Sequence, residues 1–570
     1  MLYFKANRAE ALINIIALVL FIAFVIGQGI LAFERSPSSD DALFLSVPKN
    51  WLNDYGWATS YSEKIPFNPD FTGPAALLLP AALLIKIFGN QWWIGGVTGW
   101  AVNLVLSALC LWQIRRYGRN PALIMLCLCG GIVAAFAQDF SSLIGYYTGS
   151  LLFLLSACVS FNKSYSIKNC ALFLGIATSI SLLIKPLLLP AFIWLNLVFL
   201  LSVFIQAKKL LILIVLLVLP SIFISSTSFL LQKNALQDYS TIYQANYQQY
   251  KQDFIHHHGS GIGQWLQAEE KLPYLFRNAN KNLYFVEEGL AEFGIKNPFL
   301  GNEPADIYHI VGILYVLGLI AISIITFKKI IQCRDVSPFT WLIFSINTCI
   351  LIYILWFVIF AMAMSPGHLY FPMQWSLWLL FVLAAQLLST QCAFKNTALT
   401  SLVVLLSIGV IMEPATRKSV FLWDNNAVQK TAGLDQAIQH LTNTHASQLA
   451  GCGYNGYPRH IEYRLPTSQN FADCLDLIED HVIRVGEHYQ WKSPLAFTLV
   501  LSLQTLSFDP AVAPISAACM NNVLYRNRDI LIFQCSFEDL KTINLDALMP
   551  KIDATHQWYK TRLSNTATPK

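Results

Sequence analysis

The chain has 570 residues, of which 55% are hydrophobic and only 12% are charged. Soluble globular proteins carry about 25% charged residues, so this composition excludes a single soluble domain, and its apolar content excludes a disordered chain. Its 12 cysteines are too sparse for a disulfide scaffold. The net charge of +5 comes without a basic stripe interleaved with aromatic residues, so nothing indicates nucleic acid as a partner.

About eleven apolar runs are long enough to cross a bilayer, whose hydrocarbon core of about 30 Å needs about 20 residues of helix. They lie at roughly 11–33, 93–113, 121–138, 142–161, 169–185, 187–206, 210–231, 307–327, 338–361, 373–391 and 397–413. The first lacks a small-residue cleavage site, so we expect a retained anchor. The predicted fold is an α-helical polytopic membrane protein over 1–413, followed by a small soluble α/β domain over 414–570.

Basic residues in the short loops predict which side each loop faces, because cytoplasmic loops collect Lys and Arg. With the N-terminus inside, the inner loops carry Lys5, Arg8, Arg115, Arg116, Arg119, Lys163, Lys168, Lys208, Lys209, Lys328, Lys329, Arg334 and Lys395. The short outer loops carry only Lys185. This asymmetry places two long loops, 34–92 and 232–306, and the tail 414–570 on the outer face.

Segment 74–89, PAALLLPAALLIKIFG, is predicted to lie along the outer membrane boundary as an amphipathic helix. Sixteen residues at about 1.5 Å each reach only about 24 Å, and Pro80 and Lys86 interrupt the run. An additional crossing here would also turn every basic loop outward. A short tilted span, paired with a missed one elsewhere, is the alternative.

The tail shows helical patterns near 428–445 and 471–485, and strand-like runs near 496–507 and 529–535. Its four cysteines are an even number, so an oxidising compartment would allow up to two disulfides; they are Cys452, Cys474, Cys519 and Cys535. No Cys or His spacing suggests zinc. The consecutive His256, His257 and His258 cannot easily converge on one ion, so we expect a solvated loop.

Ionisable residues at the outer ends of the spans are the candidate site, because membrane proteins rarely keep charge at depth without a function. The acidic candidates are Asp40, Asp41 and Asp139, and the cationic or hydrogen-bonding candidates are Lys86, Lys185, His368 and Tyr370. A carboxylate can take the proton of an acceptor hydroxyl while cations stabilise a departing phosphate. Alternatively, Asp40 and Asp41 are only favourable charges at a helix N-terminus, worth about 0.3–1 kcal/mol.

The order of these features resembles the GT-C superfamily of polyprenyl-phosphate-sugar-dependent glycosyltransferases, which includes protein O-mannosyltransferases and lipid A aminoarabinose transferases. In that family an acidic pair follows the first helix, as Asp40-Asp41 does here, and a proline-led interfacial helix ends in Phe-Gly, as in NPDFTGPAALLLPAALLIKIFGNQ. Asp139 and LLIKPLL match the later acidic residue and lysine. One departure is SPGHLYFPMQW, with Leu369 where bacterial members often carry Arg.

The resemblance implies inverting transfer of a sugar from a polyprenyl-phosphate donor. It makes Asp40 the first choice for the base and Asp41 the second, with Asp139 orienting the acceptor or assisting. Lys86, Lys185, His368 and Tyr370 would bind the donor phosphate, and neither a metal nor a cofactor is expected. The overall build resembles that of bacterial members, so we expect an inner-membrane protein with a periplasmic tail.

The acceptor stays open between a glycolipid, a lipopolysaccharide and a protein of the envelope. Three other functions compete with this one. They are a lipid-sugar flippase or transporter, a glycan polymerase or ligase that uses a diphosphate-linked oligosaccharide, and an inactive relative that serves in assembly. Transporters usually place charge near the membrane midplane and repeat their halves, whereas the ionisable residues here gather at one face.

Overall fold

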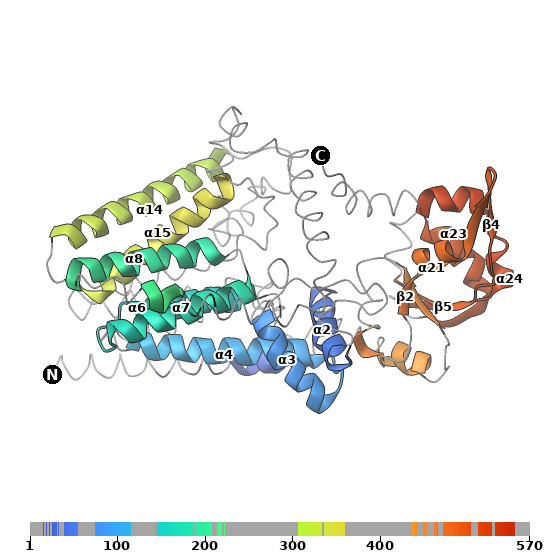
Figure 1. The fold of residues 1–570 in the computed structure, drawn as a ribbon, viewed down its shortest axis with the longest axis horizontal. Coiled ribbons are helices and arrows are strands. Elements are labelled where there is room, and N and C mark those ends of the chain that lie inside the picture. The colour runs from blue at the N-terminus through green and yellow to red at the C-terminus, as the bar shows by residue number, and fades with distance from the viewer. Residues whose placement is uncertain are drawn as a thin grey trace.

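The computed structural model describes residues 39–54, 75–115, most of 143–207, 306–332 and 336–359 in the apolar part of the chain. It also describes isolated helical residues between 15 and 33 and between 214 and 222. In the tail it describes 435–442, 448–452, most of 461–465, 471–502, 511–526 and 530–552. Figure 1 shows long helices lying roughly side by side, with a pair of shorter helices between them and a β-sheet.

The long helices correspond to predicted spans. They are α4 (Trp93–Arg115), α6 (Tyr146–Ser160), α7 (Ile167–Ile184), α8 (Leu189–Ala207), α14 (Asp306–Gln332) and α15 (Pro338–Ile359). Sequence neighbours pack against one another, and α15 also packs against α8. Of the described helices, three are long and apolar enough to cross a membrane, at Trp93–Gln113, Ile167–Ile184 and Ile313–Gln332. The expected spans 121–138, 373–391 and 397–413 lie outside the described residues.

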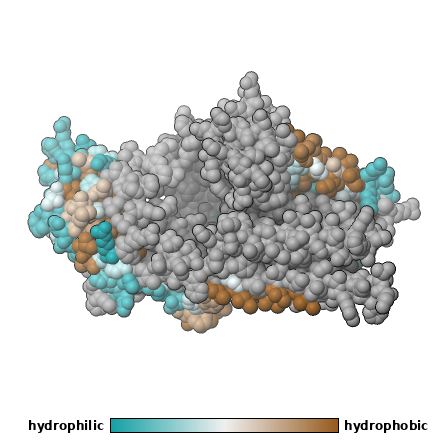
Figure 2. Space-filling model, turned by 180° about the vertical axis from the view of Figure 1, so that it is seen from behind, coloured by the Kyte–Doolittle hydropathy of each residue, from teal (hydrophilic) through white to brown (hydrophobic). Residues whose placement is uncertain are grey.

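Hydroxyl groups inside these helices bond to the backbone of their own helix. Thr98, Ser156 and Thr348 each donate to the carbonyl four residues earlier, at 2.6–2.7 Å. Such bonds satisfy a polar group where no water is present. Large apolar side chains instead cover the outer surface of the helices, for example Leu314 and Ile325, and Figure 2 shows this hydrophobic surface beside a largely hydrophilic tail. This distribution is the one expected of helices surrounded by lipid.

Two shorter helices precede α4. Helix α2 (Ser39–Leu52) has Asp40 and Asp41 in its first turn. Helix α3 (Ala75–Phe88) occupies the predicted 74–89 segment and ends at Gly89, whose φ of 72° favours glycine. One face of α3 is buried and the opposite face exposes Leu79, Leu83 and Ile87, which recur at a spacing of four. The helix is therefore apolar on both faces. One face packs inside the protein, and the exposed face is available to contact an apolar surface such as lipid.

The tail contains a five-stranded sheet of order β2-β1-β5-β7-β6. Its strands are β1 (Leu449–Cys452), β2 (Phe471–Asp473), β5 (Phe497–Ser502), β6 (Val523–Arg526) and β7 (Ile530–Cys535). β1 pairs parallel with β2 and β5, and β7 pairs antiparallel with β5 and β6. Both faces are buried: Val500 and Ile532 point into one core, whereas Leu499, Leu501 and Phe533 point into another. Burial on both faces explains why β5 and β7 are continuous apolar runs.

Short helices cover one face of this sheet, namely α21 (Cys474–Asp480), α23 (Val512–Cys519) and α24 (Phe537–Leu540). The helix predicted near 471–485 was only partly right, because α21 is flanked by β2 and by β3 (Val482–Val485). β3 forms a hairpin with β4 (His488–Trp491) through Gly486, whose φ is 67°. A glycine at the turn favours the hairpin over a continued helix. The strands predicted near 496–507 and 529–535 correspond to β5 and β7.

Candidate active site at one end of the helices

The turn that leads into α6 is bound by an acidic side chain from α2. The backbone N–H of Leu143 donates a hydrogen bond of 2.8 Å to the Oδ1 atom of Asp41. Gly145 then has a φ of 82°, which favours glycine, and Tyr146 begins the helix. The turn from Leu143 to Tyr146 thus has a conformation fixed by its own glycine and by a carboxylate from a distant segment.

Asp41 is almost fully buried, at 3% exposure. Leu45 lies one turn further along α2 and belongs to the same buried cluster as Leu143. A side chain placed at Gly95 in α4 would meet both Leu45 and Leu143, at 3.2 and 3.4 Å, so the three segments approach closely here. Polar and apolar contacts therefore fix α2 against the turn together, and a buried carboxylate needs such a donor to offset its lost hydration.

A lysine at the end of α7 lies against the other end of this turn. Lys185 caps the helix, its backbone N–H donating to the Ser181 carbonyl at 2.8 Å, and the following Pro186 prevents the helix from continuing. Its side chain is 8% exposed, and its Nζ atom lies 4.7 Å from the centre of the Tyr146 ring. A cation above an aromatic face is stabilised by the ring electrons.

The structure therefore brings a carboxylate and an ammonium group to two ends of one short turn. Three peptide units separate Leu143 from Tyr146, so the turn spans at most about 11 Å. A carboxylate can accept a proton, and an ammonium group can stabilise an anion such as a phosphate. The arrangement has the components of an acid–base reaction in which negative charge develops on a leaving group.

The other predicted site residues are placed as follows. Asp40 precedes Asp41 in the first turn of α2. Lys86 lies in the last turn of α3, where its side chain is exposed, and it makes no hydrogen bond or ion pair with any described residue. Asp139, His368 and Tyr370 lie outside the described residues. Asp139 is four positions before Leu143 in the sequence.

Two components of this site were absent from the sequence-based prediction. Tyr146 was not singled out, although the sequence GYY at a helix start offers aromatic rings where interfacial aromatics are common. The Leu143 contact uses the backbone N–H, which every residue except proline has, so the residue type gives no indication of it.

The tail contacts the turn that joins α3 to α4. The Tyr463 hydroxyl donates to the Gln91 carbonyl at 3.0 Å, and the Arg464 guanidinium donates to the Asn90 carbonyl. The Trp92 indole N–H donates to Asp435, which also forms a 3.2 Å ion pair with Arg464. Burial raises the pKa of Tyr463 well above its ordinary value, so its hydroxyl stays protonated and able to donate.

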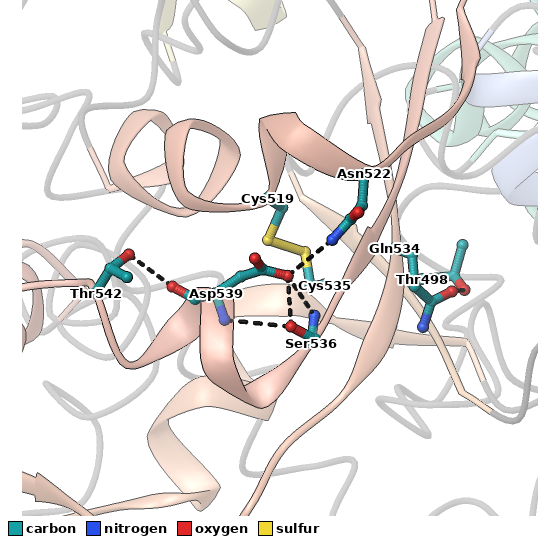
Figure 3. The surroundings of a disulfide bond; sticks show 8 residues. All are labelled: Thr498, Cys519, Asn522, Gln534, Cys535, Ser536, Asp539 and Thr542. Atoms are coloured by element: carbon teal, nitrogen blue, oxygen red, sulfur yellow. Dashed lines mark hydrogen bonds between the residues drawn. A yellow bond between two sulfur atoms is a disulfide. The ribbon is translucent and has the colours of Figure 1, made fainter.

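Among the described residues, no group of three or more His, Cys, Asp or Glu side chains is arranged to hold a metal ion. Cys519 and Cys535 form a disulfide, shown with its neighbours in Figure 3, and Cys474 is also disulfide-bonded. Disulfides persist in oxidising compartments.

No protein family profile matches the chain, and no curated protein matches it. Two solved structures resemble it, both of ArnT from Cupriavidus metallidurans. The complex with undecaprenyl phosphate aligns with a TM-score of 0.47 and 12% identity, covering 91% of this chain and 97% of that one. The apo structure aligns with 0.42 and 13%, covering 92% and 98%.

TM-scores below 0.5 do not establish a common fold. The likeness therefore transfers neither an activity nor a ligand to this chain.

Proposed function

We propose that the protein is an integral-membrane glycosyltransferase that moves a sugar from a polyprenyl-phosphate donor to an envelope acceptor, with inversion at the sugar carbon. The observation that carries the proposal is the pairing of buried Asp41 and Lys185 on the turn from Leu143 to Tyr146. A transferase of this kind needs a base for the acceptor and a cation for the leaving phosphate, close together at the end of the helices.

In the proposed reaction a carboxylate takes the proton of the acceptor hydroxyl as the oxygen attacks the sugar carbon. A bond forms between that oxygen and the carbon, and the bond from the carbon to the phosphate oxygen breaks on the opposite side. The phosphate leaves with the electron pair, and Lys185 stabilises the charge that develops on it. No metal is required by this scheme, because the lysine supplies the positive charge.

Asp40 is our first choice for the base, and Asp41, the carboxylate held at the turn, is the second. Asp41 is buried and accepts the Leu143 N–H, so it holds the connection that carries Asp139. Asp139 would then face the acceptor. His368 and Tyr370 remain candidates for the phosphate, as does Lys86, whose exposed position in α3 beside apolar residues suits a lipid headgroup.

We further propose that residues 414–570 form a small α/β domain on the outer face, in the periplasm of a bacterial inner-membrane protein. The mixed sheet, its covering helices and the Cys519–Cys535 disulfide support this. The tail contacts the turn between α3 and α4, and α2 contacts the turn before α6, so the tail and the candidate site share one side of the helices.

The proposal is tested by incubating purified protein with a labelled polyprenyl-phosphate sugar and envelope acceptors. Asp40→Asn should lower the transfer rate on the order of 10²-fold or more, because the base is lost. Asp41→Asn and Asp139→Asn should also reduce transfer, whereas Asp480→Asn in the tail is the matched control. Wild-type transfer by both Asp40→Asn and Asp41→Asn would eliminate the base assignment. Translocation of the lipid-linked sugar without transfer would identify a flippase instead.

The orientation has a separate test. Single cysteines placed at Arg116 and Asn302 should react with a membrane-impermeant maleimide from opposite sides of the membrane. Reaction of both from the same side would overturn the topology while leaving the transfer assay to decide the activity.

A further inference from the structure

The tail contributes an arginine whose guanidinium bonds to the turn between α3 and α4. Its guanidinium donates to the Asn90 carbonyl, lies 3.3 Å from the Gln91 Oε1 atom and stands 5.2 Å from the centre of the Trp92 ring. The arginine is Arg464, whose side chain is only 20% exposed. A planar guanidinium can hold two acceptors and a ring face at once, which a lysine cannot do.

Asp435 completes this contact. Its Oδ1 atom accepts from both the Trp92 indole and the Arg464 guanidinium, so one carboxylate links the tail arginine to the membrane-proximal tryptophan. Tyr463 adds a hydrogen bond to the Gln91 carbonyl from the neighbouring position. Every residue of the turn from Asn90 to Trp92 therefore bonds to the tail.

The apolar core continues across the same boundary. One buried cluster contains Leu77, Leu78 and Ile85 of α3, and it also contains Leu441, Tyr463, Val500 and Ile532 of the tail. Phe44, Leu45 and Leu143 belong to this cluster as well. The sheet face that the tail's own short helices leave uncovered is thus buried in a core shared with α2 and α3. A shared core makes the tail part of the scaffold that carries the candidate site.

The held turn lies directly after the last turn of α3. The Gly89 N–H donates to the Ile85 carbonyl at 2.8 Å, and Lys86 is the next residue after Ile85. Any movement of the turn would shift the end of α3, because the backbone bonds join them. Displacement of a binding group by about 1 Å is enough to lower the affinity for a ligand or the rate of a reaction substantially.

We propose that Arg464 is a positioning residue of the donor site: through Asn90, Gln91 and Asp435 it fixes the turn after α3, and with it the helix end that carries Lys86. This inference rests on the proposed function, because the donor is taken to be a polyprenyl phosphate. It assigns the tail a direct role in donor binding, which goes beyond its placement on the outer face.

The test compares Arg464→Ala, Arg464→Lys and wild type, with Arg484→Ala as the matched control. Arg484 is a tail arginine on the β3–β4 hairpin that also stands over a ring, Tyr489, but it does not contact the turn. We expect Arg464→Ala to raise the dissociation constant for undecaprenyl phosphate, and the donor KM, by about tenfold, with the acceptor KM unchanged. Arg464→Lys should be intermediate, and Arg484→Ala should match wild type.

Hydrogen exchange supplies a measurement that does not depend on the donor. Amides of residues 85–94 should exchange faster in Arg464→Ala, whereas amides of β5 and β7 should keep their protection, which shows that the tail remains folded. Asp435→Asn should also raise the exchange rates of these amides, by a smaller factor. This variant replaces Arg464→Ala in the test if Arg464→Ala fails to fold. Wild-type exchange at 85–94 together with wild-type donor affinity would overturn the inference.

The two proposals fail in different ways. If the wild-type protein does not bind undecaprenyl phosphate, the proposed function fails, and faster exchange at 85–94 then supports only the contact between Arg464 and the turn. If the wild type binds the lipid and Arg464→Ala binds it equally well, the positioning role fails while the proposed function stands.

Discussion

Polar groups and cysteines have different surroundings and different partners in the helical region and in the tail. In the helical region the described cysteines, Cys110, Cys158, Cys170 and Cys349, are buried thiols, and hydroxyls bond within their own helix. In the tail Cys519 and Cys535 are joined, and charged groups such as Asp546 and Lys541 stay at the surface. The difference indicates lipid as the surroundings of one region and water as those of the other.

Against this contrast, the few buried charged side chains of the helical region are exceptions. Asp41 and Lys185 are buried at 3% and 8% exposure, although their neighbours along the helices are mostly apolar. A charge in such a position is costly unless it has partners, and both residues have them in the turn from Leu143 to Tyr146. The variants below test whether the two regions differ as this interpretation requires.

The largest stability effect is expected from the tail disulfide. Replacing Cys519 and Cys535 together by serine opens a link between residues 16 positions apart, and loops of about that length correspond to about 3 kcal/mol. Thermal unfolding of the full chain should show an earlier tail transition, as dithiothreitol should also cause in wild type. Cys170→Ala, at a free cysteine, is the control, and an equal loss of stability there would remove the contrast.

Lys185→Met is expected to lower kcat/KM for the polyprenyl-phosphate donor by about tenfold, equivalent to about 1.4 kcal/mol, because the cation beside Tyr146 is lost. Lys185→Arg should keep part of the activity. Lys168→Met, at the opposite end of the same helix and exposed, should leave the constant unchanged. A similar effect at both lysines would show that Lys185 acts only through the overall charge.

A smaller effect is expected at a hydrogen bond between two helices. The Thr148 hydroxyl of α6 donates to the Asn103 side chain of α4 at 2.7 Å, and such bonds inside membranes are worth about 0.6 kcal/mol on average. Thr148→Val should lower the unfolding free energy of the helical region by about that amount. Thr98→Val removes only a bond within α4 and should cost less. A larger loss of unfolding free energy in Thr98→Val than in Thr148→Val would contradict the importance of the contact between helices.

The smallest effect is a pH dependence in the tail. The Tyr489 backbone N–H and then the His488 side chain hold the pKa of Asp546 below its ordinary value. The folded state therefore favours the carboxylate, so its stabilisation is present above about pH 3.9 and is lost as the pH falls through the lowered pKa. The protection of the β3–β4 hairpin amides against hydrogen exchange, measured relative to the intrinsic rate at each pH, should fall in acid, and Asp546→Asn should abolish this dependence. Asp480→Asn, the control, should retain it.

Much of the fold was predictable because it depends on local sequence. Apolar runs bounded by polar residues predicted α4, α7, α8 and α15 to within a few residues, and Gly89 marked the end of α3. The segment 471–485 was harder, because a seven-residue helix between two short strands gives too few residues for either period to dominate. The acidic pair and Lys185 were identifiable by type, since charge is rare among apolar residues.

What the sequence determined by itself is a chain of apolar helices with a more polar, cysteine-bearing tail and ionisable residues at one face, because hydropathy and charge are properties of neighbouring residues. Only the tertiary structure decided which of these residues meet. Asp41 reaches Leu143 across 102 positions, and Arg464 reaches Asn90 across 374. Each contact uses a backbone group, which is chemically the same at every position, so only packing could select the one that receives the side chain.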